Sequence, residues 1–135
     1  MDEKVKDPNI RVANFLGYTF YPWNNTVGKT HGWQKSDYHP NYSKDADAYL
    51  CKHRSELCFS SNFNRTTLIF NKLRRLNFDF SINCKQGQYI FIIEGLQIVG
   101  PTIPYIVFEG VIKLLDKYGD NAWPEPKNKQ PWDND

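Results

Sequence analysis

The chain has 135 residues, of which 40% are hydrophobic and 16% aromatic, and its formal net charge is +2. No apolar run approaches the ~20 residues needed to cross a bilayer, and no basic segment followed by an apolar stretch resembles a secretory signal. The weak charge argues against a nucleic-acid partner, because such proteins usually carry a clustered basic surface. We therefore expect a cytoplasmic, single-domain protein without a membrane partner.

The first predicted helix runs from Pro8 to Leu16. Asp7 provides an N-cap, Pro8 suits the first turn, and Gly17 tolerates the left-handed conformation that often ends a helix. The short segment from Tyr18 to Tyr21 follows and has a composition typical of a strand.

Between Gly17 and Tyr42 the chain combines aromatic residues with turn formers. Its aromatic residues are Tyr18, Phe20, Tyr21, Trp23, Trp33, Tyr38 and Tyr42. Turn formers such as Pro22 and Gly28 exclude one regular helix or strand. Rings in such a segment can pack on the protein's own core, on another subunit or on a flat ligand, and the sequence leaves these alternatives open.

The next predictions are short elements within a long irregular stretch. They are a strand from Trp33 to Tyr38, a helical turn from Asp45 to Cys51, and an edge strand from Leu57 to Ser60. Long irregular segments are uncommon in compact domains and are often functional. We therefore expect the specificity of the protein to lie in residues 22–56.

A second helix is predicted from an N-cap at Asn62 or Asn64 to about Leu76. Its expected buried stripe is Phe63, Thr67, Phe70 and Leu73, whereas Arg65, Lys72 and Arg75 are expected to lie off the stripe.

A hairpin follows this helix. Residues Phe78 to Ile82 alternate between apolar and polar, as in a half-buried strand. The pair Gln86-Gly87 marks a turn. The run Tyr89 to Ile93 is apolar throughout, which predicts a central strand that is covered on both faces.

The third predicted helix begins after Thr102, has Pro104 in its first turn and ends at Gly119. It is apolar over more than half its girth, which predicts deep burial or a contact with a second subunit, and we expect a homo-oligomer. In the tail that follows, Trp123 and Trp132 are expected to contact either the chain's own domain or a neighbour.

Together these elements predict one α+β domain over residues 1–119. A small, mainly antiparallel sheet is expected to be sandwiched by helices in an α-β-α arrangement, with the aromatic loop at 22–56. Residues 120–135 form a tail that contains Pro and Trp.

This order of elements resembles the phage ABA sandwich domain family of small bacteriophage and prophage proteins. The resemblance is carried by Val12-Ala13-Asn14-Phe15-Leu16-Gly17-Tyr18, the loop around Trp33, Ser60-Ser61-Asn62-Phe63-Asn64 and the helix from Phe108 to Tyr118, and it spans most of residues 8–119. It implies a sheet between helices and a phage origin. The family has no established activity, so no catalytic or binding residue is inherited from it.

Motifs for catalysis and metal binding are weak in this sequence. The spacing of Cys51, His53 and Cys58 is not that of a usual zinc site, and we interpret the cysteines as reduced thiols. Gly28-Lys29-Thr30 lacks the preceding glycine and the strand-to-helix setting of a phosphate loop. We therefore expect a non-enzymatic protein with no metal and no cofactor.

The aromatic loop instead interleaves rings with cationic side chains. The candidate ligand-binding residues are Trp23, Lys29, His31, Trp33, Lys35, Tyr38, His39, Tyr42, Arg54 and Arg65. Rings that stack on bases beside cations that pair with phosphates are suited to a nucleotide, although the same mixture suits a protein interface.

These features lead to two functional hypotheses. The first is a phage protein in the host cytoplasm that binds and sequesters a small nucleotide-type immune signal of the host, such as a cyclic oligonucleotide or an ADP-ribose-like compound. Such a protein would act as an anti-defence sponge. The alternative is a protein–protein interaction module that inhibits or modulates a host protein through the aromatic loop.

Overall fold

In the computed structural model of the chain, we describe residues 7–21, 31–35, 38 and 48–120. The elements, in chain order, are α1 (Pro8–Phe15), β1 (Tyr18–Tyr21), β2 (Gly32–Lys35), β3 (Tyr49–Cys51), the 3₁₀ helix η3 (Arg54–Glu56), α2 (Phe63–Arg75), β4 (Phe80–Lys85), β5 (Gln88–Ile93), β6 (Leu96–Gly100) and α3 (Ile103–Tyr118). The chain therefore forms a single α+β domain with antiparallel strands, as predicted.

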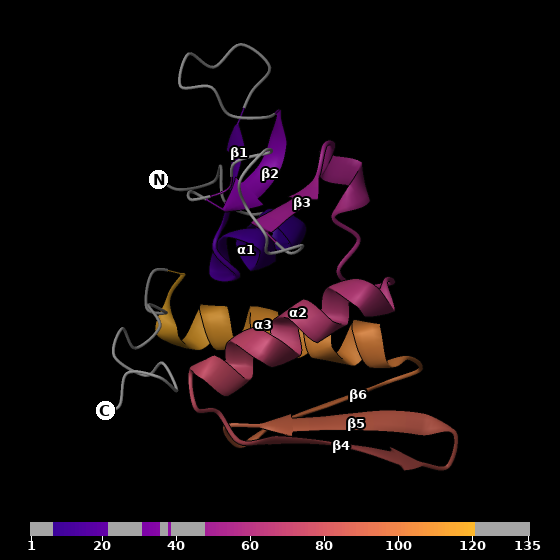
Figure 1. Cartoon of the computed structure of the whole chain (residues 1–135). Coiled ribbons are helices and arrows are strands. Elements are labelled where there is room, and N and C mark those ends of the chain that lie inside the picture. Colours follow the sequence, from indigo (N-terminus) through magenta and orange to yellow (C-terminus); the bar gives the residue numbers. More distant parts are fainter. Residues whose placement is uncertain (1–6, 22–30, 36–37, 39–47, 121–135) are drawn as a thin grey trace, which may run out of the picture.

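The strands in the described part of the chain form two three-stranded sheets, with the orders β1-β2-β3 and β4-β5-β6. Figure 1 shows α2 and α3 against one face of the β4–β6 sheet, and α1 with the β1–β3 sheet beyond these helices. The layers thus differ from the expected single sheet between helices. The other face of the β4–β6 sheet carries polar residues such as Ser81, Asn83 and Gln97 together with the exposed apolar residues Ile92 and Val99.

Strand β5 is central, as predicted, because it pairs with both β4 and β6. The prediction that both of its faces are covered is wrong. Phe91 and Ile93 are buried, whereas Ile92 between them is 37% exposed. Successive residues of a strand point to opposite faces, so an unbroken apolar run can still leave every second side chain outside.

Strand β6 is an element that the sequence pattern did not reveal. Glu94 and Gly95 both adopt positive φ and form the tight turn that leads into it. Ile98 is buried and Val99 is 47% exposed, so β6 shows the ordinary alternation of a strand with one covered face.

The three helices begin and end where their caps indicate. The side chains of Asp7, Asn62 and Thr102 accept hydrogen bonds from the first turns of α1, α2 and α3, respectively. Gly119 follows α3 with φ 95°, a conformation that favours glycine. These boundaries confirm the predicted helices to within a residue.

The predicted buried face of α2 is correct at Leu73 and partly correct at Phe70, which packs half-buried against the core, but it is wrong at the start of the helix. Phe63 is 54% exposed and Thr67 is exposed, whereas the buried residues are Thr66, Ile69, Lys72 and Leu73. Lys72 was expected to lie off the buried face, but its ammonium lies 5.7 Å from the centre of the Phe15 ring. Its long aliphatic stem can cover apolar surface while the charge rests on this ring.

Two of the short predicted elements are also different. Within the expected helical turn at Asp45–Cys51, residues Tyr49–Cys51 form strand β3, which pairs with β2. The expected edge strand from Leu57 to Ser60 is instead a turn that follows η3. There the backbone N–H of Phe59 donates to Oδ1 of Asn9, a bond that ties this turn to α1. The predicted strand at β1 is confirmed with its bounds, whereas those at β2 and β4 are confirmed with shifted bounds, since Tyr38 and Phe78 lie outside the strands.

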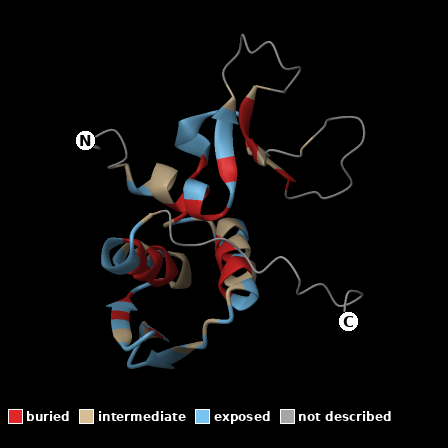
Figure 2. Cartoon of the chain, turned by 90° about the vertical axis from the view of Figure 1, so that its left-hand side faces the viewer, coloured by how far each residue is buried: buried red, intermediate tan, exposed pale blue. Residues whose placement is uncertain are grey.

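Helix α3 is the centre of the core. It contacts α1, α2, β5 and β6, so its apolar surface has partners within the chain. Both long helices carry buried and exposed sides in Figure 2. None of the helices in the described residues is long and apolar enough to span a membrane. A homo-oligomer and the placement of Trp123 and Trp132 stay predictions, and these two tryptophans lie outside the described residues.

Candidate functional site

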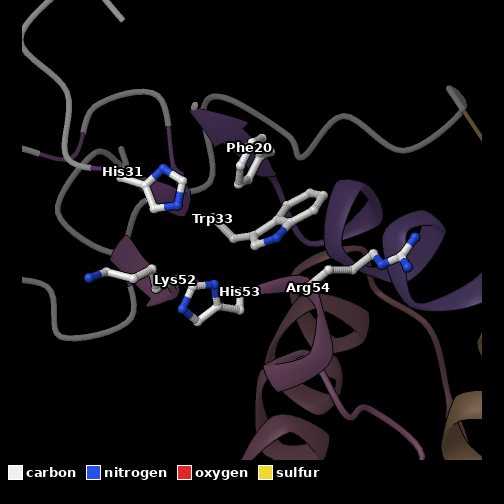
Figure 3. Close-up of a pocket in the computed structure, with 6 residues that line it drawn as sticks. All are labelled: Phe20, His31, Trp33, Lys52, His53 and Arg54. Atoms are coloured by element: carbon white, nitrogen blue, oxygen red, sulfur yellow. The ribbon is translucent and has the colours of Figure 1, made fainter. Parts of the chain in front are cut away.

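A surface hollow of about 370 Å³ lies on the β1–β3 side of the molecule. Its lining residues are Phe20, His31, Trp33, Lys52, His53 and Arg54, and Figure 3 shows their side chains grouped around it. The volume is at the lower end of the ~300–1,000 Å³ that is usual for small-molecule sites. We call this feature the hollow and consider its aromatic and cationic parts in turn.

The aromatic part of the hollow is built by the pairing of β1 with β2. Phe20 and Trp33 are direct partners in this pairing, so their side chains lie on the same face of the sheet. Their ring centres are 5.4 Å apart at an interplanar angle of 51°. The His31 ring meets Phe20 edge-on, with centres 5.4 Å apart. Trp33 is 6% exposed and Phe20 is 40% exposed, so Phe20 offers the accessible ring.

The cationic part of the hollow is the run Lys52-His53-Arg54, which directly follows β3. Cys51 is opposite Trp33 in the pairing of β3 with β2, and this pairing brings the run to the aromatic residues. The His53 ring lies 6.3 Å from that of His31. Because Lys52, His53 and Arg54 are all exposed, their charged or polar ends are accessible to solvent.

Glu56 fixes the backbone of this cationic run. Its Oε1 accepts hydrogen bonds from the backbone N–H groups of Lys52, at 3.1 Å, and His53, at 2.9 Å. The bond from His53 is the main cause that lowers the pKa of Glu56 below its ordinary value. Glu56 therefore acts on the hollow by shaping its edge.

Arg65 supports the same segment from α2. Its Nε donates to the carbonyl of Leu57 at 3.2 Å, and its Nη2 donates to the carbonyl of Glu56 at 3.0 Å. Arg65 was a candidate ligand-binding residue, but its guanidinium is engaged with the backbone of the segment that carries the hollow. It positions that segment instead of lining the hollow.

Three of the described candidate residues converge on the hollow, namely His31, Trp33 and Arg54. Lys35 lies elsewhere, with its ammonium 5.6 Å from the centre of the Tyr18 ring. Tyr38 packs against Tyr49 at a ring distance of 5.3 Å. The candidates Trp23, Lys29, His39 and Tyr42 lie outside the described residues.

Sequence reasoning missed three residues that line the hollow: Phe20, Lys52 and His53. Phe20 belongs to the aromatic stretch, and its place in a strand opposite Trp33 was the missing information. The run Lys52-His53-Arg54 contains three consecutive basic side chains. That run was a usable signal for an anion site.

The cysteines near the hollow are free thiols, as predicted. Cys51 Sγ contacts the carbonyl of His53 at 3.5 Å, and Cys58 Sγ contacts the carbonyl of Ser55 at 3.0 Å. Burial raises the pKa of the Cys51 thiol above its ordinary value. Among the described residues, no three His, Cys, Asp or Glu side chains are grouped as they would be around a metal ion.

The fold and the hollow together define a small α+β protein with an aromatic and cationic surface site. No family model, curated protein or solved structure matched the chain in the comparisons. The resemblance to the phage ABA sandwich domain family therefore stays a prediction.

Proposed function

We propose that this chain is a non-enzymatic binding protein that holds a small nucleotide-type ligand in the hollow. The observation that carries the proposal is the meeting of stacking rings and cationic side chains around one hollow. Within the part of the chain that the structure describes, none of the residues that line the hollow carries a carboxylate. This combination is complementary to a ligand that joins a flat base to an anionic phosphate.

The two parts of the hollow supply the two contacts that a nucleotide needs. Phe20 is the exposed ring on which a base can stack, and Trp33 supports it from below. Lys52, His53 and Arg54 provide N–H donors for phosphate oxygens. The volume suits one nucleotide unit, and the open side leaves room for the remainder of a larger ligand.

Arg54 is available to a ligand despite its ion pair with Asp7. Nη1 of Arg54 lies 3.3 Å from Oδ2 of Asp7, and the Arg54 side chain is 67% exposed. Exposed ion pairs contribute little net free energy, typically about 0–1 kcal/mol. A phosphate can therefore replace Asp7 as the partner of Arg54 at low cost.

The biological role that we attach to this binding is anti-defence. We propose that a phage-encoded protein of this kind sequesters an immune signal of the host in the host cytoplasm, the signal being a cyclic oligonucleotide or an ADP-ribose-like compound. Sequestration needs tight binding and no turnover. A hollow with base-stacking and phosphate-pairing groups meets that requirement.

A thermal-shift titration tests the proposal. The panel is cyclic di- and trinucleotides, cyclic ADP-ribose isomers, NAD, ATP and AMP. A ligand that binds only the folded state raises the free energy of unfolding by about 2.7 kcal/mol at a hundredfold excess over Kd. We expect Lys52→Ala and Arg54→Ala to reduce the shift, whereas Lys113→Ala, an exposed change on α3, leaves it unchanged. A shift that survives Lys52→Ala with Arg54→Ala would contradict binding at the hollow.

The alternative is an interaction module that contacts a host protein through the same surface. It is favoured by the 40% exposure of Phe20, a large apolar ring beside an arginine and a tryptophan, since aromatic residues and Arg are enriched at interface hot spots. This alternative predicts a specific partner protein. Its binding would be lost with Phe20→Ala and would be unaffected by every nucleotide in the panel.

A further inference from the structure

The indole N–H of Trp33 is a buried donor at the hollow. Trp33 is 6% exposed, and its Nε1 has no hydrogen-bond partner among the described residues. Buried polar groups are almost always paired, and an unpaired one costs free energy. A buried donor without an acceptor, on a residue that lines a hollow, indicates that a bound molecule supplies the acceptor.

The surroundings of this N–H define the kind of acceptor. Figure 3 shows the indole nitrogen on the side of the ring that faces His53 and Arg54. Lys52, also in the lining, adds a further cation. An acceptor that lies among these side chains is stabilised most when it is an anion, because a charge-assisted hydrogen bond is stronger than a neutral one. The exposed side chains of His53 and Arg54 can turn aside to admit it.

We infer that Nε1 of Trp33 donates a hydrogen bond to a phosphate oxygen of the bound nucleotide and thereby fixes its orientation. The phosphate lies toward Lys52, His53 and Arg54, and the base lies on Phe20. This inference rests on the proposed function and adds a specificity residue to it. Its consequence is that the site distinguishes a nucleotide from the corresponding nucleoside.

The substitution Trp33→Phe isolates this role, because it keeps an aromatic ring in place and removes only the N–H and part of the ring volume. The probes are AMP and adenosine, which share the base and differ in the phosphate. A hydrogen bond to a charged group corresponds to about a tenfold or greater change in affinity. By calorimetry, we expect Trp33→Phe to weaken AMP binding by about tenfold or more and to change adenosine binding by less than about twofold.

The matched variant is Phe20→Leu, which we expect to weaken AMP and adenosine alike because both would lose the stacking surface. The inference is overturned if Trp33→Phe weakens both ligands equally or leaves AMP unchanged. In either case AMP binding by the wild-type protein would leave the proposed function standing. If the wild-type protein binds neither AMP nor any compound of the nucleotide panel, the proposed function fails and the inference fails with it.

A second measurement uses the unmodified protein and does not depend on how the variant folds. In ¹⁵N-labelled protein, the indole resonance of Trp33, identified by sequential assignment, should shift with AMP and stay near its free position with adenosine. An indole resonance that responds equally to both, or to neither, would exclude a bond to the phosphate.

Discussion

Glu56 is the residue whose role is most different from what its charge alone would indicate. A carboxylate beside an anion site would repel a phosphate, yet both backbone bonds of Glu56 hold the cationic run in place. We expect Glu56→Ala to free the amides of Lys52 and His53 and to weaken nucleotide binding. Glu56→Gln keeps a carbonyl oxygen and should preserve most of the backbone bonding and most of the nucleotide affinity. Amide hydrogen exchange at Lys52 and His53 checks this, and unchanged exchange in Glu56→Ala would exclude the role.

The lowered pKa of Glu56 determines the direction in which the free energy of unfolding changes with pH. The carboxyl group binds its proton less readily in the folded protein than in the unfolded chain. The bonds therefore contribute fully above the ordinary pKa of a glutamate, about 4.3, and are lost as the pH falls through the lower, folded value. We expect the carboxyl ¹³C resonance of Glu56 to titrate with a midpoint below about 4.3. A midpoint at or above that value would contradict the backbone bonds.

Helix α3 contains a position at which helix propensity and core packing favour different residues. Gly110 lies within this helix, and a Cβ added there would lie 2.5 Å from Cε2 of Phe91, whose side chain is fully buried. Replacing Gly by Ala in a helix gains about 1 kcal/mol of helix propensity, whereas overpacking a core costs about 1–3 kcal/mol. Because this contact is so close and the Phe91 ring is fully buried, we place the free-energy cost of overpacking in the upper part of that range. It should therefore exceed the gain in helix propensity.

We therefore expect Gly110→Ala to lower the free energy of unfolding by about 1–2 kcal/mol. The matched control on the same helix is Lys113→Ala, which is exposed and should change stability by less than about 0.5 kcal/mol. Urea unfolding of the two variants and the wild-type protein measures these changes in the free energy of unfolding. A Gly110→Ala protein that is more stable than the wild type would show that Phe91 can move and that propensity prevails.

Elements with local signals were predictable from the sequence, and elements set by long-range packing were not. The caps Asp7, Asn62 and Thr102 act within one turn of their own helices, so their positions could be read directly. The buried face of α2 depends on where α1 and α3 lie, and the periodicity that placed Phe63 and Thr67 on this face did not contain that information. Strand β6 was missed although its turn, Glu94-Gly95, has the same conformation as the Gln86-Gly87 turn that was recognised.

The candidate site depends on the whole molecule more than on any one element. Its lining residues come from three separate segments, at 20, at 31–33 and at 52–54, and the β1-β2-β3 pairing brings them together. The sequence could supply the kind of chemistry, namely rings beside cations. It could not supply the strand partners, which is why Phe20, Lys52 and His53 were missed while Lys35 and Arg65 were included.

An ionic contact between α1 and the end of α3 adds to the shared hydrophobic core that joins the β1–β3 sheet to the helices. Nε and Nη2 of Arg11 donate to the two carboxylate oxygens of Asp120 at 3.0 and 2.8 Å, and Nη1 lies 3.0 Å from Asp116. These bonds raise the pKa of Arg11 further above its ordinary value. Since α1 leads directly into β1, this contact reinforces the packing of the β1–β3 sheet against the helices.

We expect Arg11→Ala to lower the free energy of unfolding by about 1–2 kcal/mol, because the two bonds to Asp120 and the ion pair with Asp116 are lost from a partly exposed site. The Arg11 side chain is 16% exposed and that of Asp116 is 62% exposed, so the control Asp116→Asn should cost less than about 0.5 kcal/mol. Urea unfolding followed by circular dichroism measures both. Equal losses in the two variants would contradict the main role given to Asp120.

The measurement that tests the central claim most directly is a map of amide and indole chemical-shift changes as AMP and cyclic ADP-ribose are titrated into the ¹⁵N-labelled protein. Binding at the hollow predicts saturable shifts at Phe20, His31 and Trp33 and along 52–54, with the outer face of the β4–β6 sheet unaffected. Saturable shifts that leave the hollow unchanged and cluster elsewhere, or no shifts with either compound, would contradict a nucleotide site at this place.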